Sequence, residues 1–105
     1  MLGFKFIQDE IHLVDDNNKI VDIIANPAFL YNKVTGSIYK IGESAIVQQK
    51  FDQIVKQDFT GIIAADLVLF QFDLTQWDKK DVANEMDKLL NNTGYVSLFL
   101  KKYSL

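Results

Sequence analysis

The sequence predicts an α+β protein, a two-layer sandwich in which two helices cover one face of a mixed, mostly antiparallel sheet of about five strands. Three observations lead to this prediction. Short apolar stretches separated by polar turns fill the first 40 residues, two amphipathic segments occupy the second half, and a long apolar run lies between them. A length of 105 residues is typical of one domain, so we expect residues 1–105 to fold as a single domain.

The first strands follow from alternation and from one polar turn. Leu2, Phe4 and Phe6 recur at every second position, which is the period of a half-buried strand. The apolar segments 11–14 and 20–25 flank the polar run 15–19. Because Asp and Asn favour turn conformations, these two segments should form a hairpin.

Pro27 is the only proline, and it should end the strand that precedes it. A residue before proline avoids the helical region, and proline cannot donate to a strand ladder. Beyond it, the segments 29–31 and 37–40 are expected to form a further hairpin around residues 32–36.

A first helix is predicted to begin at Ser44, a suitable N-cap, and to end at Thr60-Gly61. Its largely apolar stripe recurs at helical spacing and consists of Val47, Phe51, Ile54, Val55 and Asp58/Phe59. The run that follows, Ile62 to Leu74, is apolar at nearly every position. That pattern predicts a long central strand with both faces covered.

The segment 75–78 resembles a capping box with Asp78 at the third helical position, so it predicts a second helix. This helix has Val82, Met86, Leu89 and Leu90 on one side, and residues 91–94 should stop it. Residues 95–103 are expected to form the last strand. If that strand pairs with 62–74, the two run parallel through a right-handed crossover.

Missing residue types narrow the chemistry. The chain has eleven lysines but no arginine, no cysteine and a single histidine, His12. Arginine is the usual bidentate reader of phosphate and carboxylate, while cysteine and histidine supply most transition-metal ligands and bases near neutral pH. We therefore expect no cofactor, no metal and no disulfide, and we favour a non-enzymatic protein.

Net charge and hydropathy bear on partners and location. The net charge of −3 and a pI near 4.9 argue against nucleic acid and against an anionic membrane surface. The longest apolar tract, 61–70, is too short to span a bilayer, and the first ten residues lack the pattern of a signal peptide. The expectation is a cytoplasmic protein of bacterial or phage origin.

Asp66 is a candidate polar anchor. In an alternating strand it shares a face with Ala64 and Val68, where a carboxylate either has a raised pKa or pairs with a donor. Such a group in an apolar pocket is typical of a small-ligand site. The alternative is a structural role. In that case a bulge or a strand end lets the Asp66 carboxylate reach water, or a lysine or tyrosine forms a hydrogen bond with it.

Three further polar groups have structural interpretations. His12 lies between Ile11 and Leu13, so we expect it on the polar face of its strand, at the surface. The run 15–18 lacks the spacing of a calcium loop and is interpreted as a turn. The acids at 78, 81 and 85 open a helix and are interleaved with lysines, which predicts a solvated helix face.

Aromatic residues supply the remaining candidate site. Tyr95, Phe99 and Tyr103 would line one face of the last strand, with Lys101 among them. If the helices cover the opposite face, this aromatic face stays open, and an open aromatic strip is typical of a protein contact. The alternative is that a loop or the segment 26–40 folds over it and completes the core.

Three hypotheses of function follow. The first is a small non-enzymatic binding or adaptor protein that contacts a protein partner, or a second copy as a homodimer, through the aromatic face. The second is a ligand-binding domain or minimal enzyme anchored on Asp66. The third is an accessory or inhibitor protein of a phage or mobile element that masks a basic partner.

Overall fold

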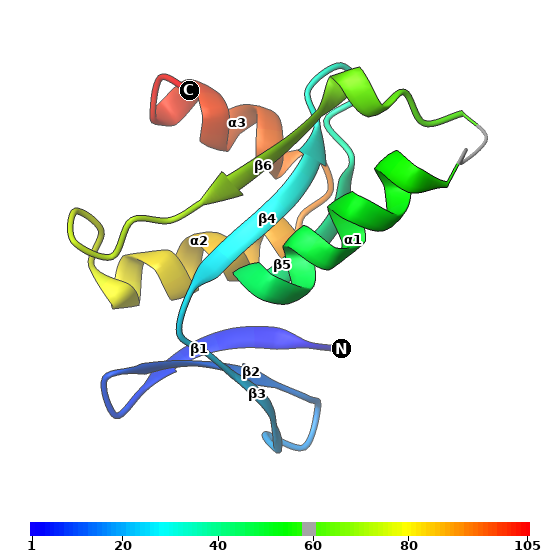
Figure 1. Ribbon diagram of the computed structural model, residues 1–105. Helices are drawn as coiled ribbons and strands as arrows, with labels where there is room; N and C mark the ends of the chain where they lie inside the picture. Colours follow the sequence, from blue (N-terminus) through cyan, green and yellow to red (C-terminus); the bar gives the residue numbers. More distant parts are fainter. Residues whose placement is uncertain (58–60) are drawn as a thin grey trace.

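The structure is a computed structural model that describes residues 1–57 and 61–105. The α+β class is confirmed, since the described chain contains two three-stranded sheets and three α-helices (Figure 1). The expectation of one sheet with about five strands is wrong. Every strand pair among the described residues is antiparallel, so the predicted parallel pair is wrong as well.

The first sheet is a meander of β1 (Gly3–Ile7), β2 (Glu10–Val14) and β3 (Ile20–Ile24), which confirms the predicted strand and hairpin. Gln8 and Asp9 both have positive φ, the geometry of a tight two-residue hairpin turn. In the second turn the Asp15 carboxylate accepts hydrogen bonds from the backbone N–H groups of Asn17 and Lys19. This turn uses the local bonding that Asp favours.

The second sheet has the order β5-β4-β6, with β4 (Pro27–Asn32) in the middle, flanked by β5 (Ile38–Glu43) and β6 (Leu67–Gln71). The hairpin around residues 32–36 is confirmed. The Asn32 side chain accepts from the backbone N–H groups of Val34 and Thr35 and so shapes its turn. Every residue of β4 is buried.

Helices lie on both faces of the second sheet, whereas the sequence predicted them on one face. α1 (Ser44–Lys56) packs on one side, where Val47 and Ile54 meet Ala28, Leu30 and Leu67. α2 (Lys79–Asn91) and α3 (Tyr95–Lys102) lie on the other side. This double cover explains why β4 has no exposed residue.

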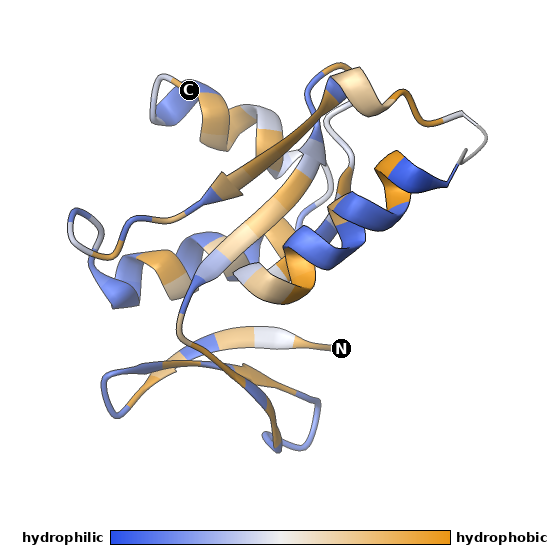
Figure 2. Cartoon of the chain, viewed as in Figure 1, coloured by the Kyte–Doolittle hydropathy of each residue, from blue (hydrophilic) through white to orange (hydrophobic). Residues whose placement is uncertain are grey.

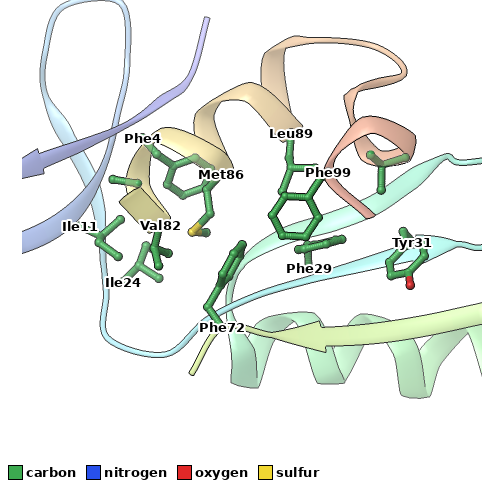
Figure 3. Close-up of a cluster of buried hydrophobic side chains, with 12 residues drawn as sticks. Phe4, Ile11, Ile24, Phe29, Tyr31, Phe72, Val82, Met86, Leu89 and Phe99 are labelled. Carbon is green, nitrogen blue, oxygen red and sulfur yellow. The ribbon is translucent and has the colours of Figure 1, made fainter. Parts of the chain in front are cut away.

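α2 serves both sheets. Its Val82 and Met86 pack against Phe4, Ile11 and Ile24 of the first sheet, in the same cluster that reaches the second sheet (Figure 3). The predicted apolar side of this helix, with Val82, Met86 and Leu89 buried, is therefore confirmed. The first sheet thus has one face covered by α2.

The prediction that residues 62–74 form a single long strand is wrong. Only Leu67–Gln71 forms β6, preceded by the short 3-10 helix η1 (Ala64–Asp66). β6 pairs with β4 alone and lies at a sheet edge. An apolar run gives no signal for where a strand begins inside it, so sequence reasoning extended it too far.

The prediction that residues 95–103 form a strand is also wrong, because residues Tyr95–Lys102 form α3. Residues four apart share a face in a helix as well as in a strand, so the aromatic spacing fits both. Gly94 has a φ of 87° and lets the chain turn sharply between α2 and α3. Two lysines in the last turn of α3 favour the helix through its dipole.

Helix termini differ in detail from the expectation. α1 has Glu43, not Ser44, at its N-cap, and it ends at Lys56. The predicted stripe residue at 59 and the end at 60 lie outside the described residues. Asp78, not the residue at 75, caps α2, and its carboxylate accepts from the backbone N–H of Lys80 at 2.8 Å.

Candidate interaction surface

The aromatic residues of the C-terminal segment face inward. Phe99 is fully buried, and its ring lies 5.6 Å from that of Phe29 in β4 and 4.9 Å from that of Tyr103. Tyr95 and Tyr103 are half-buried. The expected open aromatic face is therefore wrong. Among the ring contacts of the described residues, only Phe99 packs on a residue of the segment 26–40, as the alternative expected, whereas the ring of Tyr103 lies 4.5 Å from that of Trp77. Lys101 is exposed on the last turn of α3.

Tyr95 belongs to a polar tie between α2 and α3. Its hydroxyl donates to Glu85 Oε2 at 2.6 Å, and Lys102 Nζ lies 3.2 Å from Glu85 Oε1. Glu85 is only 4% exposed, so the predicted solvated face holds for Asp78 and Asp81 but is wrong for Glu85. The error arises because α3 folds back over this part of α2.

The hydrogen bonds and charges of this group shift the pKa values of Glu85 and Tyr95. Burial alone would raise the pKa of Glu85, but the hydrogen bonds from Tyr95 and Lys102 and the nearby lysine charges outweigh it and lower that pKa. Burial and the Glu85 carboxylate raise the pKa of Tyr95 to about 12. The group therefore holds two helices together with Glu85 ionised and Tyr95 neutral.

Asp66 does not lie inside a strand. It is the last residue of η1, it is half-buried, and its backbone C=O accepts from the N–H of Lys33 at 2.9 Å. This position matches the alternative in which a strand end gives the carboxylate access to water. Among the described residues no group of three His, Asp or Glu side chains could hold a metal ion.

His12 is buried, which corrects its predicted surface position. It is 4% exposed in the middle strand β2, opposite Lys5 of β1 and Ile23 of β3. Side chains from both neighbouring strands flank a central-strand residue, so a polar face need not expose it. Its Nε2 lies 3.3 Å from Glu10 Oε1, and its Nδ1 has no hydrogen-bond partner within the described chain.

The strand register places His12 on the side of the first sheet that points away from α2. We call this side the outer face. It comprises Lys5, Ile7, Glu10, His12, Val14, Ile20 and Ile23, together with Val21 at a β-bulge. No element of the described chain lies beyond it (Figure 1).

The outer face is largely apolar, and its exposed part lies on β3 and β1, because His12 and Val14 of the central strand β2 are buried. Ile20, Val21 and Ile23 of β3 are 50%, 55% and 47% exposed, and Ile7 of β1 is also exposed. Figure 2 shows that hydrophobic residues occur along the strands of the first sheet. Antiparallel sheets with one solvated face normally alternate apolar and polar residues, so an apolar outer face is unusual.

A signal for this surface exists in the sequence, but alternation reasoning passed over it. β3 reads Ile-Val-Asp-Ile-Ile, so apolar residues occupy both of its faces. Such a strand looks like one that is buried on both sides. Only the structure shows that α2 covers one side and that no described element covers the other.

Charge is concentrated in the same part of the chain. Residues 1–26 hold five carboxylates and two lysines, which makes −3, the whole net charge of the protein. Glu10 lies on the outer face, and Asp9, Asp15 and Asp16 lie in the turns at its ends. The outer face is therefore an apolar surface with an acidic rim.

Two cavities elsewhere offer little chemistry. One of about 400 Å³ lies between the β4–β5 turn and the junction of α2 and α3, and its lining contains no ionisable side chain. Another of about 350 Å³, beside Pro27 and Phe72, has Asp73 as its only ionisable group. General acid–base catalysis and nucleophile activation need paired groups within hydrogen-bond reach, and neither lining provides a pair.

Comparisons with protein-family models, with curated proteins and with solved structures find no match to this chain. Among the helices of the described residues, none combines the length and apolar character needed to cross a membrane.

Proposed function

We propose that this protein is a non-enzymatic binding protein whose outer face docks on a basic protein partner. The observation that carries the proposal is the row of half-exposed aliphatic side chains on β3, Ile20, Val21 and Ile23, on a sheet face that no described element covers. Covering a half-exposed aliphatic side chain stabilises a complex by about 1 kcal/mol. Several such residues therefore supply the apolar centre of an interface.

The acidic rim favours a partner of opposite charge over a second copy. In a twofold dimer through the outer face, each acidic rim would face the same rim on the partner copy. Like charges brought together across an interface oppose association, whereas a lysine- or arginine-rich rim would be attracted. The same charge pattern suits the hypothesis of an inhibitor that masks a basic partner.

His12 and Glu10 add a polar feature to this surface. They contact each other on β2, between the exposed side chains of β1 and β3. The His12 side chain is buried, whereas the Glu10 side chain is 50% exposed. A donor on the partner that bonds to the Glu10 carboxylate would add specificity to an otherwise apolar contact.

The test uses two matched double variants of the full chain. Ile20→Ser/Ile23→Ser makes the outer face polar, and Val34→Ser/Leu98→Ser removes two exposed apolar side chains from other places. Each is used as bait for partner capture from the cells that naturally produce the protein, at low and at high salt. We expect the first variant to lose a salt-sensitive partner and the second to retain it, with circular dichroism unchanged in both. Equal capture by both variants would refute the proposal.

A further inference from the structure

β5 is an edge strand with an open main chain. Among the described residues it pairs only with β4, in the order β5-β4-β6. Asn26 O accepts from Ser44 N at 2.7 Å, whereas Pro27 O accepts from Phe72 N at 2.9 Å, on the side of β6. Alternate residues of β4 therefore bond to opposite neighbours.

The same alternation fixes which groups of β5 are available. Gly42 and Lys40 stand opposite Ala28 and Leu30 and bond to β4. Ile41, between them, directs its backbone N–H and C=O to the open edge. An edge of this kind is a template for one more strand.

Two cavities flank this stretch of β5. The first, of about 250 Å³, lies toward the first sheet and α2, and its apolar lining includes Leu2, Phe4, Leu13, Ile38, Ile41 and Leu90. The second, of about 300 Å³, lies toward α1 and is lined by Tyr39, Lys40, Ile46, Gln49, Lys50 and Gln53. Both cavities also share Tyr39 and Lys40, so they adjoin the same two residues of β5.

The packing of β5 places the two cavities on opposite faces of the second sheet. Ile38 and Ile41 pack with the cluster that contains α2, whereas Tyr39 packs with the cluster that contains α1. Side chains of an added strand would point alternately to these two faces. The side chains that point toward α2 would enter the aliphatic cavity. The side chains that point toward α1 would face the amide and lysine side chains of the second cavity.

We propose that the β5 edge binds an extended peptide segment of a partner protein, in which apolar residues alternate with acidic ones. Main-chain hydrogen bonds to Ile41 hold the segment as a fourth strand. Its apolar side chains enter the cavity beside Leu90, and its carboxylates face Lys40 and the amides of Gln49 and Gln53. This site shares no residue with the outer face, so the result of its test does not depend on the function proposed above.

The binding test uses a defined probe, the peptide acetyl-Val-Glu-Val-Glu-Val-amide, titrated into the full chain and followed by NMR. We expect shifts of the backbone amide of Ile41 and of signals from Leu90 and Gln49, with Leu98 on α3 unmoved. N-methylation of alternate peptide amides removes the strand donors and should weaken binding about tenfold. Equal binding of the methylated peptide, or no shift at Ile41 with millimolar peptide, would overturn the proposal.

A charge exchange tests the specificity. Lys40→Glu should weaken the glutamate peptide about threefold and strengthen a lysine-containing counterpart by a similar factor. Lys56→Glu makes the same charge change at an exposed residue of α1, outside the proposed site, and should alter the affinity for neither peptide. If the chain instead forms a dimer in sedimentation velocity, with the Ile41 signal moving as protein concentration rises, the edge belongs to a second copy and the peptide proposal is wrong.

Discussion

Replacing Phe99 with alanine tests how the C-terminal segment folds. Phe99 is fully buried, and its ring centroid lies within 5.8 Å of those of Phe29, Phe70, Phe72 and Tyr103. Removing a buried phenylalanine ring loses its transfer free energy and leaves a cavity, which together destabilise a protein by about 3–5 kcal/mol. Domains of this size unfold with about 5–15 kcal/mol, so the variant should lose a large share of its stability.

The assay is urea unfolding followed by circular dichroism, with calorimetry for the midpoint. Leu98→Ala is the matched control, because Leu98 is the adjacent residue of α3 and is 61% exposed. It should change the unfolding free energy by less than about 0.5 kcal/mol. Phe99→Leu keeps most of the volume, and we expect a loss of about 1–2 kcal/mol in a chain that still folds. If Phe99→Ala costs no more than Leu98→Ala, then α3 does not pack on the second sheet and the described core is wrong.

Four further predictions concern a helix cap, two pH dependences and a candidate site. Asp78→Ala should destabilise the protein by about 1 kcal/mol, because it removes the cap of α2, and Thr75→Ala should cost clearly less in the same urea assay. The lowered pKa of Glu85 means that its stabilising contribution is present above about pH 4.5 and is lost as pH falls below that value, a loss that should be absent in Glu85→Gln. The pKa of Tyr95 is raised, so its contribution is present below pH 10 and is lost as pH rises from 10 to about 12; Tyr95→Phe should remove this alkaline dependence in thermal melts. Asp66→Asn should leave the unfolding free energy within about 0.5 kcal/mol of the parent, since only backbone groups of Asp66 make hydrogen bonds in the described contacts, and a larger loss would reveal a buried role for its carboxylate.

The N-terminal half followed closely from local chemistry. Alternation over residues 2–6, the Asp-Asn turn at 15–19 and Pro27 each act within a few residues, and the structure has strands and turns where these signals predict them. Local hydrogen bonding and backbone restriction determine such elements, so one sequence suffices to find them.

The second half required tertiary information. The spacing of Tyr95, Phe99 and Tyr103 fits one face of either a helix or a strand, and only packing against Phe29 and Phe72 distinguishes the two. The same holds for β6, where an apolar run contains a loop, a 3-10 turn and an edge strand. Apolar character predicts burial there but not conformation.

The candidate site was the least predictable part. The aromatic residues that the sequence favours as a contact surface complete the core, because the second sheet lies against α3. The surface that is exposed consists of aliphatic residues on β3, which a sequence reader assigns to a core. Whether a face of β3 is covered depends on where the distant helix α2 packs. The local sequence of β3 does not indicate that position.

Site-specific photo-crosslinking shows which protein the outer face contacts. Ile23→p-benzoylphenylalanine places the reactive group on the outer face, and Val34→p-benzoylphenylalanine places it at the exposed β4–β5 turn as a control. After irradiation of the native cells, we expect a discrete adduct with a basic protein from position 23 and none from position 34. An adduct from position 34 alone, no adduct from either position, or an adduct at twice the 12.0 kDa chain mass from position 23 would contradict the account.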